Sequence, residues 1–363
     1  MTQDTRFDAA MTRALELALR GPAWGVNPQV GAVILDQNLN IIAEGWHEGS
    51  GTDHAEVMAL KNLAQSGWGE VPPNATAVVT LEPCNHTGRT GPCAQALIEA
   101  GVSRVVYASS DPGNQSANGA ETLRAAGIEV IAGVMQAQAD FQNRVWLTAT
   151  RQGRPYVTLK WATSVDGRAA ANDGSSKWIS GPESRADSHR RRSEVDAILV
   201  GTGTVLADDP ELTARRQDGS LYEHQPLRVI VGQTEIQPFM RVYNEDAETI
   251  QLRTHSIHGV LAELHERGIK HVWIEGGPHL ASQFVRLSLV NEYIVYLAPM
   301  LLGGERTAIR NIGVSDITEA KHLEFNQVQL IGNDLMIVAT DREAEIQILD
   351  PEREHRLLAE SDV

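Results

Sequence analysis

One pair of short motifs constrains this chain more than any other feature. His54-Ala55-Glu56 is followed further along by Cys84 and Cys93, the only two cysteines in the sequence. Neutral imidazole and thiolate groups are ligands that zinc prefers, and a catalytic zinc keeps its fourth position for water. One histidine and two cysteines leave that position open, so we predict a catalytic zinc site at His54, Cys84 and Cys93.

The position of Glu56 indicates what such a site could do. Two residues after His54, its carboxylate lies close to the metal without being needed as a ligand. It can accept a proton from a zinc-bound water and pass it to a ring nitrogen and to departing ammonia. A His-x-Glu followed by two cysteines is the pattern of zinc deaminases. We therefore predict that Glu56 is the catalytic acid and base of a deaminase acting on a pyrimidine-like ring.

Both parts of the motif are expected at helix starts. Asp53 can cap a helix beginning at His54, and Pro92 precedes Cys93 at the start of another. The positive end of a helix dipole favours thiolate over thiol. Two other interpretations stay open: buried apolar cysteines beside a surface histidine, and a structural zinc with His86 as its fourth ligand.

The length of the chain predicts two domains, because 363 residues exceed one ordinary core. Helix-like and strand-like segments alternate in both halves, which is typical of α/β sheets layered with helices. A polar seam at 152–155 gives domains over 1–150 and 151–340, followed by a charged tail over 341–363. The expected strands lie at 30–35, 41–43, 77–81, 104–108, 156–162, 197–200, 227–231, 271–274 and 293–297, and the expected helices at 54–64, 92–100 and 260–267.

Charge and hydropathy exclude several functional classes. Lys and Arg total 31 against 47 Asp and Glu, a formal net charge of −16, which argues against nucleic-acid binding. No apolar run reaches the length of a membrane span, and the N-terminus lacks the apolar stretch of a signal peptide. Two cysteines provide no disulfide framework. We expect a cytoplasmic enzyme that acts on a small molecule and binds neither nucleic acid nor membranes.

Two glycine-rich turns in the second half each follow a strand-like segment. The turn 201–204 begins like a dinucleotide-binding fingerprint but lacks the third glycine. The turn 275–278 precedes a helix-like segment, where bare backbone amides favour phosphate. From these residues alone, a plain connecting turn is as good an interpretation of either.

Longer stretches resemble one enzyme family. Residues 27–33, 54–56 and 80–93 are similar to the deaminase half of the bifunctional riboflavin-biosynthesis deaminase/reductases, the RibD family. The long segment between the two cysteines is specific to that family among deaminases of this fold. Residues 158–168, 174–179, 203–213 and 275–278 are similar to the reductase half, so the resemblance covers residues 7–340.

The resemblance implies a fold, two activities and two cofactors. The fold is expected to be α/β, with a cytidine-deaminase-like three-layer domain followed by a dihydrofolate-reductase-like domain. With Zn²⁺, the first would hydrolyse an amine from diaminohydroxyphosphoribosylaminopyrimidine. With NADPH, the second would reduce the ribosyl chain of 5-amino-6-(5-phosphoribosylamino)uracil to ribityl. We also expect a homo-oligomer, either a dimer or a tetramer.

The resemblance also implies roles for individual residues. Lys160 would polarise or protonate the sugar oxygen as hydride arrives, although a lysine at a strand end can be merely exposed. Arg192 and Arg215 suit a phosphate, because guanidinium groups bind it bidentately. The basic run 190–192 can equally be a solvated face. The other expected substrate contacts are Asn27, Ser176, Leu212 and Glu275, and the expected NADPH contacts are Ala162, Trp178, Thr204, Asp208, Gly277, Pro278, His279, Leu280, Ala281, Ser282 and Gln283.

Two stretches, Gly113-Asn114 and Gly232-Gln233, depart from the family pattern. Two alternative functions fit parts of the sequence. One is a zinc deaminase of nucleosides or tRNA with an unrelated second domain, against which the acidic charge and the long cysteine segment argue. The other is a non-catalytic nucleotide-binding protein with a structural zinc, which would have no use for the carboxylate of Glu56.

Overall fold

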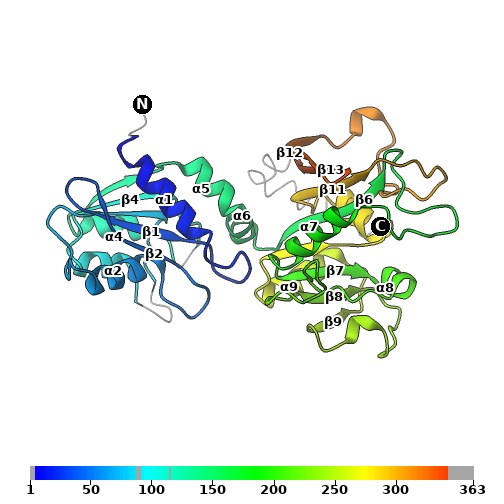
Figure 1. Cartoon of the computed structure of the whole chain (residues 1–363), viewed down its shortest axis with the longest axis horizontal. Coiled ribbons are helices and arrows are strands. Elements are labelled where there is room, and N and C mark those ends of the chain that lie inside the picture. Colours follow the sequence, from blue (N-terminus) through cyan, green and yellow to red (C-terminus); the bar gives the residue numbers. More distant parts are fainter. Residues whose placement is uncertain (1–4, 87–90, 114–115, 342–363) are drawn as a thin grey trace. The chain divides into compact units, whose positions relative to one another are not determined.

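The computed structural model describes residues 5–86, 91–113 and 116–341. The chain divides into two compact units, Met1–Gly153 and Arg154–Val363, which Figure 1 colours from blue to green and from green to red. Asn114, one of the departures from the family pattern, lies outside the described residues. So does the predicted tail apart from Asp341, which ends the last strand.

The first unit is built on a sheet with strand order β2-β1-β3-β4-β5. The second strand in this order, β1 (Gly31–Leu35), pairs antiparallel with both of its neighbours, β2 and β3. From β3 onwards the strands run parallel. The other strands are β2 (Ile41–Trp46), β3 (Thr76–Leu81), β4 (Arg104–Ser109) and β5 (Glu129–Ala132).

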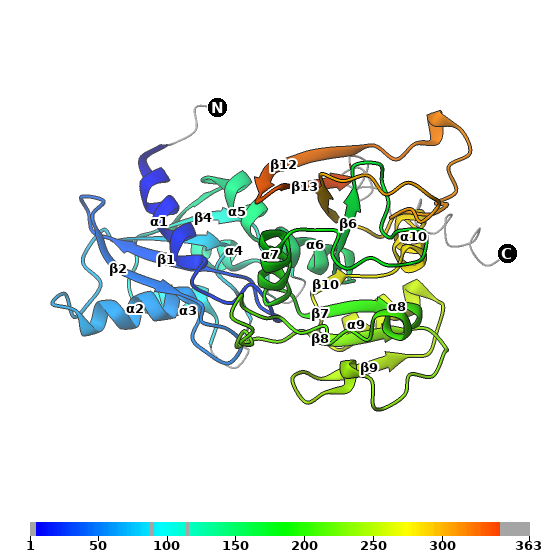
Figure 2. The same ribbon diagram turned by 45° about the vertical axis from the view of Figure 1, so that its right-hand side comes forward.

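Helices cover both faces of this sheet, because alternate strand residues point to opposite sides. Ala32 and Ile34 pack on one side with α2 (Ala55–Gln65), α3 (Cys93–Glu99) and α4 (Gly119–Ala125). Val33 and Leu35 pack on the other side with α1 (Asp8–Ala18) and α5 (Gln136–Gln142). The unit therefore has three layers (Figures 1 and 2). It begins with η1 (Thr5–Phe7) and ends with α6 (Arg144–Gln152).

The second unit is built on a sheet with strand order β12-β13-β11-β6-β10-β7-β8-β9. From β11 to β9 the strands run parallel, whereas β13 and β12 form an antiparallel edge. The strands are β6 (Tyr156–Ser164), β7 (Ala197–Gly201), β8 (Leu227–Val231), β9 (Thr249–Leu252), β10 (His271–Ile274), β11 (Glu292–Ala298), β12 (Leu323–Ile331) and β13 (Asp334–Asp341).

Two apolar clusters fill the two faces of this sheet. Leu199 and Ile274 belong to the cluster with α9 (Ile257–Glu266) and α10 (Pro278–Arg286). Ile198 and Trp273 belong to the cluster that includes Val205 of α8 (Thr202–Asp208). Because β6, β10, β7 and β8 are parallel neighbours, their carboxyl ends share one edge of the sheet. The remaining elements are α7 (Pro182–Arg192), η2 (Arg241–Tyr243) and η3 (Ile317–Glu319).

Every expected strand and helix overlaps an observed one, but the expected cap of α2 is wrong. The helix begins at Ala55, and its N-cap is His54 rather than Asp53. The Asp53 carboxylate instead lies 2.5 Å from Nζ of Lys61. A carboxylate gains more from a charged donor than from a neutral backbone N–H, which accounts for the difference.

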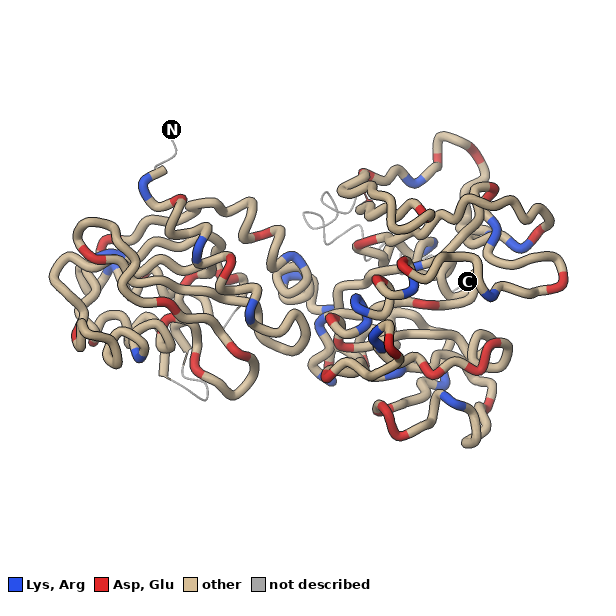
Figure 3. Tube along the Cα trace, in the orientation of Figure 1, with Lys and Arg blue, Asp and Glu red and all other residues tan. Residues whose placement is uncertain are grey.

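The described residues contain no helix long and apolar enough to cross a membrane. In both units basic and acidic residues are interspersed along the chain (Figure 3).

Candidate active sites

The three predicted zinc ligands meet in the first unit. His54 precedes α2, Cys84 follows β3, and Cys93 is the first residue of α3. Nδ1 of His54 lies 3.2 Å from Sγ of Cys93 and 3.5 Å from Sγ of Cys84. The ligand atoms of the three residues all lie within 4.8 Å of one another. A compact set of one nitrogen and two sulfur donors suits zinc.

This donor set fits a catalytic zinc. Among the described residues, the cluster contains His54, Cys84 and Cys93 but not His86, so a four-ligand structural site with His86 finds no support. Both cysteines are buried, which raises the pKa of a thiol, whereas the helix N-terminus at Cys93 favours thiolate. The hydrogen bond between the two sulfurs lowers the pKa of Cys84 and raises the pKa of Cys93.

Glu56 lies beside this cluster, in the first turn of α2, and only 4% of it is exposed. Burial raises the pKa of its carboxyl to about 7, and the charge of Cys84 acts in the same direction. A buried carboxyl next to an open metal position is the arrangement that proton transfer to a substrate requires.

Hydrogen bonds and one close backbone contact hold the loop that carries Cys84. The Glu82 carboxylate accepts hydrogen bonds from the backbone amides of Ala120, at 3.0 Å, and Asp111, at 3.4 Å. Gly119, the first residue of α4, approaches the loop so closely that a Cβ would overlap the carbonyl oxygen of Pro83. The position of Cys84 therefore depends on a glycine 35 residues further along the chain.

Replacing Gly119 by alanine is expected to destabilise the first unit by about 1–3 kcal/mol and to weaken zinc binding, because either α4 or the Cys84 loop must move. Urea unfolding and zinc affinity measure the two effects. Gly67→Ala is the matched control, since a Cβ there meets nothing within 4 Å. If Gly119→Ala unfolds and binds zinc like Gly67→Ala, the close approach has no energetic importance.

The expected substrate contact Asn27 is linked to the zinc cluster by His47, a residue that was not predicted from the sequence. Nδ2 of Asn27 lies 2.9 Å from Nε2 of His47, whose ring stands edge-on to that of His54 at 5.4 Å between centroids. His47 is buried and follows β2 directly. Its place just after a strand and seven residues before His54 was the available signal.

In the second unit, the two glycine-rich turns come together at the carboxyl edge of the sheet. The amide of Gly277 donates to Oγ1 of Thr204 at 2.8 Å, which joins the end of β10 to the start of α8. A Cβ at Gly232 would lie 2.8 Å from Oγ1 of Thr202, so the glycine that departs from the family pattern makes room for this helix start. Such an edge is where parallel α/β sheets bind nucleotides.

The expected NADPH contacts around this edge differ in accessibility. Leu280, Ala281 and Ser282 are buried in α10, so their side chains face the interior and contact with a cofactor would use the helix backbone. Trp178 is 67% exposed, with the guanidinium of Arg185 over its ring. Ala162, Thr204, Asp208, Gly277, Pro278 and Gln283 are half-buried, and His279 is exposed.

Glu275, just after β10, pairs with two cations expected at the reductase site, Arg192 and Lys160. Arg192 binds its carboxylate through two hydrogen bonds of 2.7 Å, and Nε1 of Trp273 donates to it at 2.7 Å. Nζ of Lys160 lies 3.7 Å from the same carboxylate. Burial acts to raise the pKa of Glu275, but the charges of Arg192 and Lys160 hold it far below the usual range.

Two alternatives left open for these cations, an exposed lysine and a solvated basic run, find no support in the structure. Lys160 lies inside β6 and is half-buried rather than exposed at a strand end, and burial lowers its pKa. The basic run is paired, not simply solvated: Arg190 and Arg191 bind Asp187, and Arg192 binds Glu275.

Two further expected substrate residues, Leu212 and Arg215, lie on the loop after α8. His189 of α7 contacts the backbone of this loop. Its Nδ1 lies 3.0 Å from the carbonyl oxygen of Thr213 and 3.3 Å from the amide nitrogen of Arg215. Burial, and then the charges of Arg192 and Arg215, lower the pKa of His189 to about 4. The Arg215 side chain pairs with Glu211. Ser176 is half-buried in the loop between β6 and α7, and no contact of it with this cluster is seen among the described residues.

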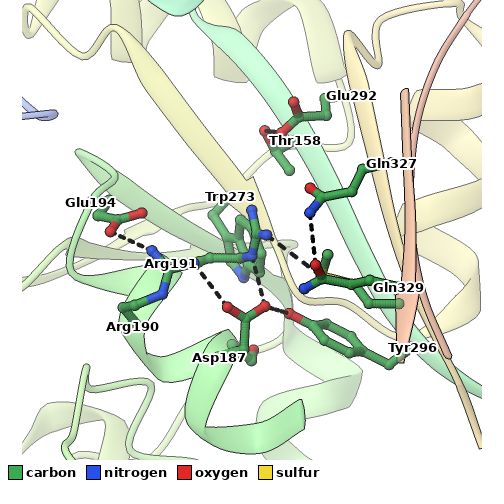
Figure 4. Close-up of polar contacts among 12 residues, drawn as sticks. Thr158, Asp187, Arg190, Arg191, Glu194, Trp273, Glu292, Tyr296, Gln327 and Gln329 are labelled. Atoms are coloured by element: carbon green, nitrogen blue, oxygen red, sulfur yellow. Dashed lines mark hydrogen bonds and ion pairs between the residues drawn. The ribbon is translucent and has the colours of Figure 1, made fainter. Parts of the chain in front are cut away.

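Helix α7, which carries Arg192, is also tied to the sheet through Tyr296. The Tyr296 hydroxyl donates to the Asp187 carboxylate at 2.6 Å, and Figure 4 shows Arg191 reaching the same carboxylate. The Tyr296 ring lies 5.7 Å from Nζ of Lys160. Tyr296 and Asp187 were not predicted from the sequence, because no local sequence pattern links residues that are 109 positions apart.

The two units match two family models. "Cytidine and deoxycytidylate deaminase zinc-binding region" matches residues 4–109, and "RibD C-terminal domain" matches residues 155–337. The fold and the zinc cluster thus define a bifunctional enzyme, with a zinc-dependent deaminase and an NADPH-dependent reductase on one chain. The expected α/β fold class is confirmed, and the alternative of an unrelated second domain is wrong.

Individual relatives match about nine-tenths of the chain. The chain is 50% identical over 334 residues to the riboflavin biosynthesis protein RibD of Mycobacterium tuberculosis, covering 91% of this chain and 96% of the relative. For RibD of Escherichia coli K12 the identity is 38%, covering 90% and 97%. A crystal structure of the deaminase/reductase of Thermotoga maritima matches with a TM-score of 0.83 and 34% identity, covering 92% and 98%. The chain belongs to the RibD family, the bifunctional deaminase/reductases of riboflavin biosynthesis.

Proposed function

We propose that the first unit hydrolyses the exocyclic amine of diaminohydroxyphosphoribosylaminopyrimidine, and that the second reduces the ribosyl chain of the resulting 5-amino-6-(5-phosphoribosylamino)uracil. The compound names are those in the description of the Thermotoga maritima structure. The observation that carries the proposal is the buried carboxyl of Glu56 beside the cluster of His54, Cys84 and Cys93.

In the deaminase unit, His54, Cys84 and Cys93 would hold the metal. When bound, zinc supplies the positive charge that makes a water molecule acidic enough to attack near neutral pH. Glu56 accepts a proton from the attacking water and delivers it to the ring nitrogen. A second proton transfer through Glu56 goes to the amine, so that the carbon–nitrogen bond breaks, ammonia leaves and a ring carbonyl remains. Asn27 holds the substrate beside these groups.

In the reductase unit, NADPH would lie along the carboxyl edge of the sheet, near Thr204 and the start of α10, because a helix N-terminus suits phosphates. When bound, it supplies a hydride for the first sugar carbon. The bond between that carbon and the ring oxygen breaks, and Lys160 donates the proton that the oxygen takes up as it becomes a hydroxyl. Glu275 holds the lysine and Arg192 in place. Arg215 binds the substrate phosphate together with the loop around Leu212.

The direct test supplies each substrate to the purified protein. Ammonia release from the diaminopyrimidine, followed by NADPH oxidation on the product, is expected. Cytidine, deoxycytidylate and tRNA are the comparison substrates for the first reaction. Faster ammonia release from any of them would overturn the proposed substrate. The homo-oligomeric state and the cytoplasmic location stay predictions, and light scattering of the purified protein tests the first.

Replacing Arg215 by alanine is expected to lower kcat/KM of the reduction by about 10- to 150-fold, the loss of about 1.5–3 kcal/mol for a charged hydrogen bond to phosphate. Ammonia release should not change. The neighbouring Arg216 packs over the ring of Tyr222, so Arg216→Ala is the matched control. Equal losses in both activities, with an intact fold by circular dichroism, would contradict separate sites.

A further inference from the structure

Helices α5 and α6 end the first unit, beyond the 4–109 segment matched by the zinc-binding family model. Asn143 stands between them, as the last residue before α6. An asparagine at this position usually caps the helix that follows. The side chain of Asn143 makes no capping hydrogen bond, so its amide group is used elsewhere.

Both ends of that amide bind the backbone of Gln29. Oδ1 of Asn143 accepts a hydrogen bond from the amide of Gln29 at 3.1 Å, and Nδ2 donates to the Gln29 carbonyl at 2.8 Å. Asn143 is 4% exposed, so water cannot readily replace either bond. Nε1 of Trp146 in α6 donates to the Val26 carbonyl at 3.1 Å. The start of α6 therefore holds the loop 26–29 at both of its ends.

The same loop continues to the zinc cluster through Asn27. Nδ1 of His47 lies 3.0 Å from the carbonyl of Asp53, the residue before the ligand His54. A carbonyl can only accept, so Nδ1 carries the proton and Nε2 accepts from Nδ2 of Asn27. This fixes the orientation of the Asn27 amide, with its oxygen turned away from His47.

We propose that Asn143, assisted by Trp146, is a positioning residue of the deaminase site that holds the loop 26–29 so that Asn27 meets the substrate. The proposal rests on the substrate contact proposed for Asn27. The part of the chain that serves deamination then extends to α6. The start of this helix contributes to substrate binding rather than to metal binding.

The first test replaces Asn143 by alanine in the full-length chain. KM of deamination is expected to rise about 10- to 100-fold, because two buried hydrogen bonds to the loop are lost. kcat should stay within about threefold, zinc should stay at one per chain, and reduction should be unchanged. Loss of zinc, or a fall in kcat with an unchanged KM, would show a general structural role and overturn the proposal.

Two further variants keep the test decisive if Asn143→Ala folds poorly. Trp146→Phe removes the indole N–H but keeps an aromatic ring, and KM is expected to rise about 3- to 10-fold. Gln142→Ala is the matched control, because Gln142 donates to the Leu15 carbonyl of α1 and no hydrogen bond from it to the loop is seen among the described residues. A rise in KM as large for Gln142→Ala as for Trp146→Phe would contradict a specific hold on the loop.

A double-mutant cycle separates this inference from the role of Asn27. If Asn143 acts through Asn27, Asn27→Ala raises KM and Asn143→Ala adds little in that background. If the two substitutions raise KM by independent factors that multiply, the inference is overturned. It is also overturned if Asn143→Ala leaves KM unchanged while Asn27→Ala raises it. Neither outcome touches the proposed role of Asn27. A wild-type KM for Asn27→Ala would instead refute the proposed substrate contact, and with it the route through Asn27.

Discussion

Replacing Glu56 by glutamine is expected to leave zinc bound while slowing deamination by about 10²–10⁴-fold. Glutamine keeps the shape of the side chain but cannot carry a proton between water and substrate. The loss should appear in kcat, with one zinc per chain retained, and NADPH oxidation should proceed normally when the deaminated intermediate is supplied.

Metal analysis and ammonia release on the same preparation measure this prediction. Glu99→Gln in the exposed end of α3 is the control for a lost carboxylate in the same unit. If Glu56→Gln loses its zinc, Glu56 is a ligand and the role proposed for it is wrong. If it deaminates at the wild-type rate, the proton passes through another group.

Replacing Cys84 or Cys93 by alanine is expected to abolish zinc binding and deamination together. The cluster offers one nitrogen and two sulfur donors, and with one sulfur gone two protein ligands remain, fewer than the three that catalytic zinc sites use. Wild-type protein should carry about one zinc per chain, since the described residues contain one such cluster.

The reductase half provides the internal control for both cysteine variants. Its proposed residues lie in the other unit, so reduction of the supplied intermediate should continue. Chelation of the wild-type protein, followed by zinc addition, should remove and restore ammonia release without changing NADPH oxidation. Full deamination by metal-free protein would refute the zinc mechanism.

The sequence by itself determined the zinc cluster and most of the framework. His54, Glu56 and Cys93 lie at the starts of helices, where a short motif already specifies the local backbone. Several predicted strands are runs of apolar residues, such as 30–35 and 197–200, whose burial follows from composition. Local patterns of this kind act over one turn or one strand, so a sequence shows them directly.

The tertiary structure alone decided which distant groups meet. Arg192 pairs with Glu275 across 83 positions, and Asn143 binds Gln29 across 114. Gly119 is required by a close approach to Pro83, not by a turn of its own. These contacts depend on strand order and on how each helix lies on its sheet. Hydrophobic periodicity specifies which face of an element is buried but not which partner covers it, so the residues that position the ligands and the substrate emerge only from the folded chain.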